Sequence, residues 1–320
     1  MENHFINTIA IKDFKCFKDF QADGFGRVNL IGGKNNVGKT AFMEACYVNV
    51  YGQNIKGLSH SLQGIKFMRE NINILENEQI NNTKKFLEQS NNIFVTSNMN
   101  QIHFRIDENE GVKKYHFEFN NQTIDVNKND FSFESGKIQN IIFIDNFGFC
   151  NSQIKDAYLL VQKQDKEQFL NNILHQFDNR IEKFIAGDVP QCRVNGEWLE
   201  LTELGDGAKH LVSIVSSLFQ CENGYLFIDE IDNGIHYTQL DELWEIILSV
   251  SKEQKVQVFA TTHSKECIES FNRVQLKLQD KETYYFEMAR NVQTNKIFIS
   301  QIDSEQLEYG LSNNERLRGE

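Results

Sequence analysis

The sequence has little proline and no long apolar segment. Pro190 is the single proline among 320 residues, which excludes collagen-like and proline-rich linker proteins. No run of about 18 apolar residues occurs, so we predict no transmembrane helix. The first residues lack the basic and apolar parts of a secretory signal, and we therefore expect a cytoplasmic protein.

Basic side chains are in the minority. The chain carries 33 Lys and Arg against 45 Asp and Glu, a formal net charge of −12. This balance argues against a generally basic surface that coats phosphates, although it leaves room for a local basic groove. A length of 320 residues with 40% apolar and 24% charged residues is typical of one large α/β domain or two small ones.

Metal-binding cysteine patterns are also missing. The six cysteines form no C-x-x-C pair, and none has a histidine at zinc-ligand spacing. Because no export signal is present, we expect free, buried thiols in a reducing compartment.

The first third of the chain predicts strands around a glycine-rich loop. Residues 5–12 and 27–31 predict two strands, and the second runs directly into the loop and then into an apolar helix. Residues 54–100 are polar and predict helix and loop without chemistry.

The middle of the chain predicts a meander and a helical segment. Short alternating runs over residues 93–145, including 130–134 and 141–145, predict antiparallel strands. Apolar residues from 154 to 185 recur at helical spacing and predict core-facing helix.

After residue 200 the pattern favours a parallel sheet. Residues 207–219 and 238–250 predict amphipathic helices, and residues 225–230 and 256–264 predict buried strands. Strands that alternate with helices are typical of an α/β fold with a mostly parallel sheet.

Residues 33–40, GKNNVGKT, match the phosphate-loop pattern G-x-x-x-x-G-K-[ST]. The glycines let backbone N–H groups surround phosphate oxygens, and the following helix presents its positive end to them. Lys39 is expected to reach the β- and γ-phosphates of ATP, and the Thr40 hydroxyl to hold Mg²⁺. A glycine-rich turn with an incidental lysine is the alternative. We predict nucleotide contacts from Gly33, Asn35, Asn36, Val37, Gly38, Lys39, Thr40 and Ala41.

Residues 225–230, YLFIDE, place two carboxylates at the end of a buried strand. Asp229 is expected to bind Mg²⁺, directly or through water, and Glu230 to orient or deprotonate the attacking water. His263 ends the next buried strand, at the sheet edge where ligands of α/β folds collect, and is expected to contact the γ-phosphate. Together with the loop, these residues predict a catalytic set of Glu230, His263 and Lys39.

Residues 204–207, LGDG, precede an amphipathic helix. Two glycines at the start of a helix can form a second anion site, whereas Asp206 can also be a plain N-cap. Spacing alone leaves both interpretations open.

The order GKNNVGKT, LGDG, YLFIDEID, THS resembles the ABC-class ATPases of the RecF/SMC kind, and most closely the OLD-like AAA ATPases. LGDG resembles a shortened ABC signature, and residues 229–237 resemble the D-loop region. The resemblance implies a P-loop NTPase of α/β fold: an ABC-type head with a mostly parallel core sheet, an antiparallel β arm and a helical lobe.

The resemblance also implies a homodimer, head to tail, with ATP and Mg²⁺ at the interface. Gly205, Asp206 and Gly207 of one protomer would contact the γ-phosphate held by its partner. Asp232 would lie at the dimer seam, beside the nucleotide. The glutamine of the Q-loop has three candidates, which are Gln101, Gln139 and Gln153.

Other family features are missing. No long heptad stretch separates the two halves, so coiled-coil arms are not expected. Too few residues follow His263 for the TOPRIM nuclease domain of OLD proteins. A single ATPase domain over 1–320 is therefore expected. Its parts are a nucleotide-binding core (1–53 and 186–275), a polar helical insert and β meander (54–145), a helical lobe (146–185), and C-terminal strands with a tail helix (276–320).

An ATPase head without an attached effector predicts a protein that works through a partner. By resemblance, the partner would be a separately encoded nuclease or toxin in bacterial anti-phage defence. A RecF-like DNA-repair clamp is the alternative, with direct nucleic-acid binding. A transporter motor is disfavoured because LGDG stands where transporters have LSGGQ, and no membrane partner is expected.

Overall fold

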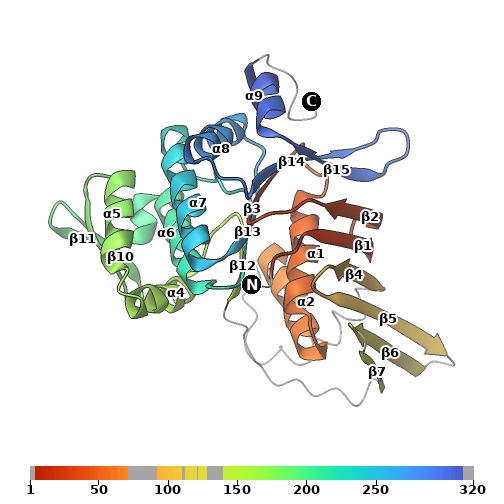
Figure 1. Ribbon diagram of the computed structural model, residues 1–320. Coiled ribbons are helices and arrows are strands. Elements are labelled where there is room, and N and C mark those ends of the chain that lie inside the picture. Colours follow the sequence, from red (N-terminus) through yellow and green to blue (C-terminus); the bar gives the residue numbers. More distant parts are fainter. Residues whose placement is uncertain (1–3, 71–91, 110–111, 121, 128–139, 313–320) are drawn as a thin grey trace. The chain divides into compact units, whose positions relative to one another are not determined.

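The structure, a computed structural model, describes residues 4–70, 92–109, 112–120, 122–127 and 140–312 (Figure 1). Contacts within the chain divide it into two compact units, which we describe separately. The first unit comprises Met1–Phe25, Asn36–Ile141 and Met288–Ile299, and the second comprises Gly26–Asn35, Ile142–Glu287 and Ser300–Glu320.

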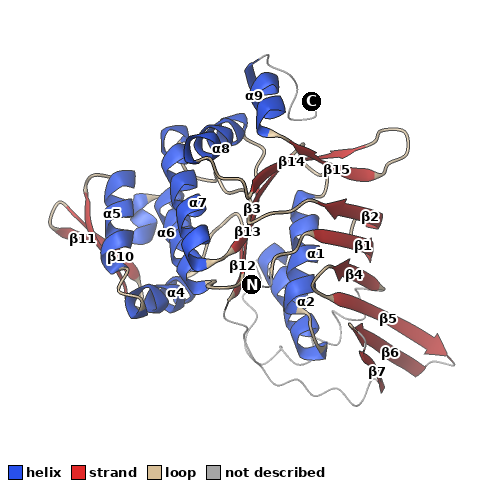
Figure 2. Cartoon of the chain, viewed as in Figure 1, coloured by secondary structure: helices blue, strands red, loops and turns tan. Residues whose placement is uncertain are grey.

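The first unit contains a six-stranded sheet in the order β2-β1-β4-β5-β6-β7, in which every pair is antiparallel (Figure 2). This confirms the predicted antiparallel arm. The elements of this unit are β1 (Thr8–Phe14), β2 (Phe17–Asp23), α1 (Lys39–Tyr51), α2 (Ile55–Glu70), β4 (Ile93–Ser97), β5 (Gln101–Asn109), β6 (Val112–Phe119) and β7 (Gln122–Asn127).

Helix α1 packs against this sheet. Strand β1 alternates buried and exposed residues, so Ile9 and Ile11 face the core. The Phe42 ring of α1 lies 5.8 Å from the Phe20 ring and 5.5 Å from the Phe25 ring, measured between centroids. Residues 41–51 of α1 are all buried, which accounts for the mostly apolar segment after the glycine-rich loop.

The second six-stranded sheet has the order β15-β14-β3-β13-β12-β8. Strands β12, β13, β3 and β14 pair in parallel, which confirms the predicted α/β fold with a mostly parallel sheet. Every residue of β3, β12 and β13 is buried, as expected for strands covered on both faces. The bounds are β3 (Val28–Gly32), β8 (Ile141–Ile144), β12 (Tyr225–Ile228), β13 (Gln257–Thr261), β14 (Thr283–Arg290) and β15 (Ile297–Ile302).

The helices of the second unit share one apolar core with that sheet. Trp244 of α7 and Phe271 of α8 meet edge to face at 4.8 Å between centroids. A small antiparallel sheet, in the order β11-β10-β9, adds to this core through Phe184 and Cys192. The bounds are α4 (Asn151–Lys163), α5 (Glu167–Phe177), β9 (Ile181–Ala186), β10 (Pro190–Val194), β11 (Glu197–Glu200), the 3₁₀ turns η2 (Leu201–Leu204) and η3 (Tyr237–Gln239), α6 (Asp206–Gln220), α7 (Leu240–Gln254), α8 (Lys265–Leu278) and α9 (Ser304–Ser312).

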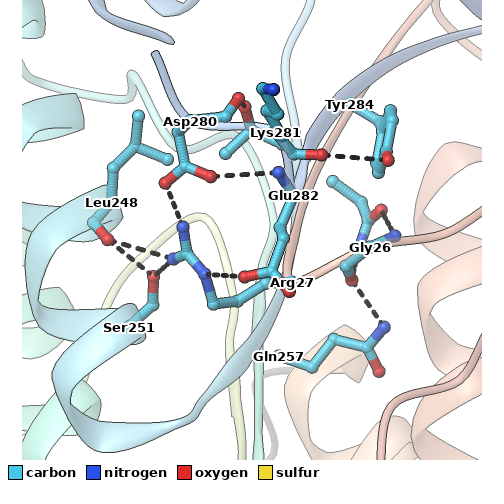
Figure 3. Close-up of polar contacts among 11 residues, drawn as sticks. Gly26, Arg27, Leu248, Ser251, Gln257, Asp280, Lys281, Glu282 and Tyr284 are labelled. Carbon is cyan, nitrogen blue, oxygen red and sulfur yellow. Dashed lines mark hydrogen bonds and ion pairs between the residues drawn. The ribbon is translucent and has the colours of Figure 1, made fainter. Parts of the chain in front are cut away.

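A buried arginine anchors the amino end of β3 (Figure 3). Arg27 is 2% exposed, and it donates to the Leu248 carbonyl at 3.0 Å and to the Ser251 hydroxyl. It also pairs with Asp280 and, at 3.4 Å, with Glu282. These contacts tie the end of α7 and the turn before β14 to the strand that leads into the glycine-rich loop.

Two predicted elements differ in the structure. Helical spacing was expected to continue to residue 185, but Ile181–Ala186 forms strand β9. The register between β10 and β9 shifts there, so Ile181 and Phe184 are both buried at a spacing of three residues, which imitates a helix. The sequence predicts residues 141–145 as part of the meander, but strand β8 lies at the edge of the second sheet, next to β12. The predicted strand at 130–134 lies outside the described residues.

All six cysteines are free, as predicted. Burial was predicted for each of them, and this is wrong for Cys16 and Cys150, which are exposed. Within the part of the chain that the structure describes, no helix is long and apolar enough to cross a membrane.

Candidate functional site

The glycine-rich loop begins at the carboxyl end of β3, in the second unit. Gly33 has a φ of +134°, a conformation that favours glycine. The preceding Gly32 is required for space, because a Cβ there would lie 2.2 Å from the Tyr285 hydroxyl. Lys34 and Asn35 follow as exposed residues.

The loop ends in the first unit, where α1 begins at Lys39. Asn36 and Gly38 have φ values of +62° and +112°, and Gly38 caps the helix, its carbonyl accepting the Phe42 N–H at 2.9 Å. Left-handed residues next to a helix N-terminus turn several N–H groups to one side, and this is the backbone form that binds phosphates. Val37 and Ala41 are buried, whereas Lys39 and Thr40 are half-buried.

The two predicted carboxylates follow β12, at the carboxyl end of the parallel strands. The Asp229 N–H donates to the Ile144 carbonyl at 2.9 Å, which joins this point to the end of β8. Glu230 has a φ of +50°, a left-handed conformation that costs a residue with a Cβ about 1–2 kcal/mol. Such strain is concentrated at functional sites, where surrounding contacts hold it in place.

His263 lies beside the second of these carboxylates. Its Nδ1 is 3.8 Å from Oε1 of Glu230, and the two side chains are 51% and 39% exposed. Both groups are therefore accessible from solvent on one edge of the sheet, which is the position that the sequence predicts for them.

Two threonines that the sequence reading did not single out connect this edge. The Thr261 hydroxyl donates to Oδ1 of Asp229 at 2.6 Å and accepts the Glu230 N–H at 3.0 Å. The Thr262 hydroxyl donates to Oδ1 of Asp232 at 2.6 Å. The sequence shows two threonines just before His263, but no local pattern indicates which residues their hydroxyls bind. Asp232 thus has a partner within its own chain, and its place at a dimer seam stays a prediction.

The LGDG segment lies at the start of α6. Gly205 is exposed, has a φ of +92° and would meet nothing within 4 Å if it carried a Cβ. Gly207 is buried, and a Cβ there would lie 2.1 Å from the Gly234 carbonyl oxygen. Asp206 is exposed and is the first residue of α6. The first glycine is therefore open to a ligand, whereas the second packs against its own D-loop region.

Asp145, at the end of β8, is a further acid that the sequence reading missed. Burial raises the pKa of Asp145, and the charge of Asp229 raises it further. The hydrogen bond from the Phe147 N–H and the charge of Lys209 lower the pKa and so partly offset this rise. Lys209 donates to the Phe147 carbonyl at 3.1 Å and so holds the turn that follows Asp145. The sequence pattern that could have identified it is an aspartate directly after an apolar strand. It was not recognised because the sequence predicts that strand as part of the meander.

Two of the three candidate Q-loop glutamines make hydrogen bonds elsewhere in the described chain. Gln101 in β5 donates to Glu118 at 3.0 Å, and Gln153 accepts the Cys150 N–H at 3.0 Å at the start of α4. Gln139 lies outside the described residues. Neither Gln101 nor Gln153 is therefore observed at the edge of the sheet that carries Asp229, Glu230 and Asp232, which we call the acidic edge.

The structure brings together Asp229, Glu230, Asp232 and His263, all in the second unit, at the ends of β12 and β13. Gly33 lies at the end of β3, the neighbour of β13 in the same sheet. Lys39, Thr40 and Ala41 belong to α1 in the first unit. The Thr40 hydroxyl in the first unit and the Asp229 carboxylate in the second are each hard oxygen donors, the kind of ligand that Mg²⁺ prefers.

Comparison with known proteins defines the class. Residues 28–269 match the AAA_21 family, described as "AAA domain, putative AbiEii toxin, Type IV TA system". The match spans both the glycine-rich loop and the acidic edge of the sheet. The chain belongs to this family, which confirms the predicted class of P-loop ATPase.

One curated relative and two solved structures are similar to this chain over most of its length. A Helicobacter pylori protein described as an ATP/GTP phosphatase is 25% identical over 382 aligned positions, covering 98% of this chain and 100% of the relative. A solved SMC head bound to the C-winged helix domain of ScpA has a TM-score of 0.51 at 10% identity, covering 94% of this chain and 99% of that one. The SMC head domain from Thermotoga maritima has a TM-score of 0.47 at 14% identity, over 93% and 99% of the two chains. The first of these heads confirms the predicted resemblance to ATPases of the RecF/SMC kind at the level of fold.

Proposed function

We propose that this protein is a dimerising, Mg-ATP-dependent ATPase that regulates a separately encoded nuclease or toxin in bacterial anti-phage defence. The observation that carries the ATPase part is the acidic edge of the parallel sheet. There Asp229, Glu230 and His263 stand at the ends of two neighbouring strands, next to the strand that enters the glycine-rich loop.

Each of these residues has a distinct task in the proposal. Lys39 and the loop amides bind the phosphates, and Thr40 with Asp229 would hold Mg²⁺, which when bound neutralises charge on the phosphate oxygens. Glu230 orients and deprotonates the attacking water. His263, at 3.8 Å from Glu230, supplies a donor toward the terminal phosphate.

Dimerisation is proposed for the LGDG segment. Gly205 and Asp206 are exposed at the start of α6, where backbone N–H groups and the positive helix end favour an anion. In the proposal, this anion is the γ-phosphate held by a second copy of the chain.

A regulated partner is supported by the family description, which refers to a toxin–antitoxin system. The relative in Helicobacter pylori is named for phosphatase action on ATP and GTP, which supports nucleotide turnover as the activity of the regulator.

The test of the ATPase and of the dimer uses Glu230→Gln. This change is expected to lower the hydrolysis rate by roughly 10²–10⁴-fold while ATP stays bound, so a dimer should accumulate with ATP. Phosphate release and light scattering with and without Mg-ATP measure the two effects. Glu222→Gln, at an exposed glutamate of the same unit, is the matched control.

Hydrolysis that survives Glu230→Gln unchanged would overturn the proposed chemistry. The partner is tested by co-purifying the Glu230→Gln variant, with ATP, with products of neighbouring genes. If the ATP-bound dimer instead captures duplex DNA, with an affinity that falls steeply with salt, a DNA clamp replaces the effector in the proposal.

A further inference from the structure

We propose that Thr261 and Thr262 are positioning residues with separate tasks. Thr261 positions the two carboxylates of the acidic edge, Asp229 and Glu230, and Thr262 positions His263. The inference rests on the proposed ATPase function of that edge. Both side chains are fully buried, with 0% exposure, at the end of the central strand β13.

Thr261 acts on both carboxylate residues through a single hydroxyl. Its proton goes to Oδ1 of Asp229 at 2.6 Å, and its oxygen accepts the Glu230 N–H at 3.0 Å. Its backbone carbonyl also accepts the Ile231 N–H at 3.0 Å. The backbone N–H groups of Glu230 and of the residue after it, Ile231, are thus both bound to Thr261 on the neighbouring strand.

This arrangement explains how Glu230 keeps its left-handed backbone. A φ of +50° is unfavourable for a residue with a Cβ unless its neighbours hold it. The hydrogen bonds from the Glu230 and Ile231 N–H groups to Thr261 supply that constraint. The bond from the Thr261 hydroxyl to Asp229 orients the Asp229 carboxylate at the same time. The Thr261 hydroxyl therefore links the proposed metal ligand to the proposed base.

Thr262 acts on the other side of the strand end. Its hydroxyl donates to Oδ1 of Asp232 at 2.6 Å and accepts the Ser264 N–H at 3.0 Å. Ser264 in turn caps α8, because its hydroxyl accepts the Cys267 N–H at 3.2 Å. His263 stands between these two anchored residues, so its backbone direction is set by Thr262 and by the start of α8.

The two hydroxyls have different partners, and so their removal should give different defects. Valine has nearly the shape of threonine but no hydroxyl, so Thr261→Val and Thr262→Val remove the bonds with little change in packing. Thr261→Ser and Thr262→Ser restore the hydroxyl. The matched control is Thr283→Val, because Thr283 is 6% exposed and its hydroxyl bonds to Gln275 and to the Asp280 carbonyl, both at 3.1 Å, at the amino end of β14.

The experiment combines two readouts on the full chain. Binding of a fluorescent ATP analogue is titrated with Mg²⁺, and kcat is measured from pH 5.5 to 9. We expect Thr261→Val to raise the Mg²⁺ concentration at half-saturation about 10-fold and to lower kcat at least as much, since bonds to charged groups are worth that factor or more. Thr261→Ser should restore both values to within about twofold.

Thr262→Val should leave the Mg²⁺ half-saturation within about twofold of the wild type. Its kcat should fall about 10-fold, and its pH profile should approach that of His263→Ala. Thr283→Val should change neither readout, although it lowers the melting temperature.

The proposal is overturned if both valine variants behave as Thr283→Val does, or if Thr262→Val raises the Mg²⁺ concentration at half-saturation as much as Thr261→Val does. If Thr261→Val does not fold, Thr261→Ala, whose smaller side chain leaves room for water, replaces it with the same expected direction. A wild-type protein without Mg²⁺-dependent nucleotide binding would instead refute the proposed function, and the two failures are therefore distinct.

Discussion

The imidazole of His263 and the carboxylate of Glu230 face each other at the ends of two neighbouring parallel strands, with 3.8 Å between Nδ1 and Oε1. The residues are 33 positions apart in the chain, and strand pairing between β12 and β13 is what brings them together. Since each side chain is part of the other's surroundings, a change in one alters the electrostatic field at the other.

Substitutions at this pair should therefore be non-additive. Glu230→Gln is expected to lower kcat roughly 10²–10⁴-fold and His263→Ala somewhat less. The double variant should lose far less than the product of the two effects, because residues that act as a unit are disabled by either change. Steady-state hydrolysis of the four proteins measures the coupling, and strictly multiplicative losses would show that the two groups act independently.

Substitution of the second glycine of LGDG should cost more stability than left-handed backbone strain alone costs at an open glycine. Gly207→Ala places a Cβ 2.1 Å from the Gly234 carbonyl oxygen and 3.2 Å from the Phe177 ring. We expect the free energy of unfolding to fall by about 2–3 kcal/mol in urea titrations, the range of overpacked sites. Gly196→Ala is the control, because Gly196 has a φ of +84° but an open surrounding, so it reports the backbone cost alone. Equal losses in the two variants would contradict the close contact.

His210 should make stability dependent on pH. Burial lowers its pKa from 6.5 to about 4, against a smaller opposite effect from the backbone of Ile231, and Lys209 adds to the lowering. As the pH falls below 6.5, the unfolded chain takes up a proton that the folded chain resists until about pH 4. The free energy of unfolding should therefore decrease across this window, by up to about 3 kcal/mol.

Urea unfolding of the wild type and of His210→Leu at several pH values between 7.5 and 4 measures this effect. The leucine variant should lose less stability than the wild type on acidification, since its side chain cannot take up a proton. An identical slope in the two proteins would rule out His210 as the source.

The buried Arg27–Asp280 pair should be costly to break from one side. Arg27→Met leaves the Asp280 carboxylate, whose side chain is 8% exposed, without its cation, and we expect a loss of about 3–5 kcal/mol in unfolding free energy. Arg193→Met is the control, because Arg193 and Glu182 pair at 2.6 Å with side chains 46% and 37% exposed, where such pairs are worth less than about 1 kcal/mol. Similar losses for both would contradict the burial of the network.

Local patterns were sufficient for the class of the protein. The glycines at 33 and 38 and the lysine and threonine that follow are contiguous, and the left-handed backbone at Gly33, Asn36 and Gly38 is encoded within the same short segment. The buried strands YLFI and QVFAT are recognisable because both faces are covered, so YLFI and the VFA centre of the second strand are unbroken apolar runs.

Local patterns failed where strand pairing decides the structure. Ile181 and Phe184 fit a helix as well as a bulged strand, and only the pairing of β9 with β10 decides between them. The apolar run of β8 resembles the strands of the meander before it, and its place beside β12 depends on chain segments more than 80 residues away. Asp145 was missed for the same reason.

By itself, the sequence determined that this chain is a P-loop ATPase with a mostly parallel α/β core, because phosphate-loop geometry and strand burial are written into short contiguous segments. Only the tertiary structure decided which groups support the acidic edge. The bonds from Thr261 to Asp229 and Glu230 span 32 and 31 residues, and a threonine near the end of a strand carries no local sign of its partner. Such contacts exist because parallel strands align their carboxyl ends, a property of the folded sheet rather than of any segment within it.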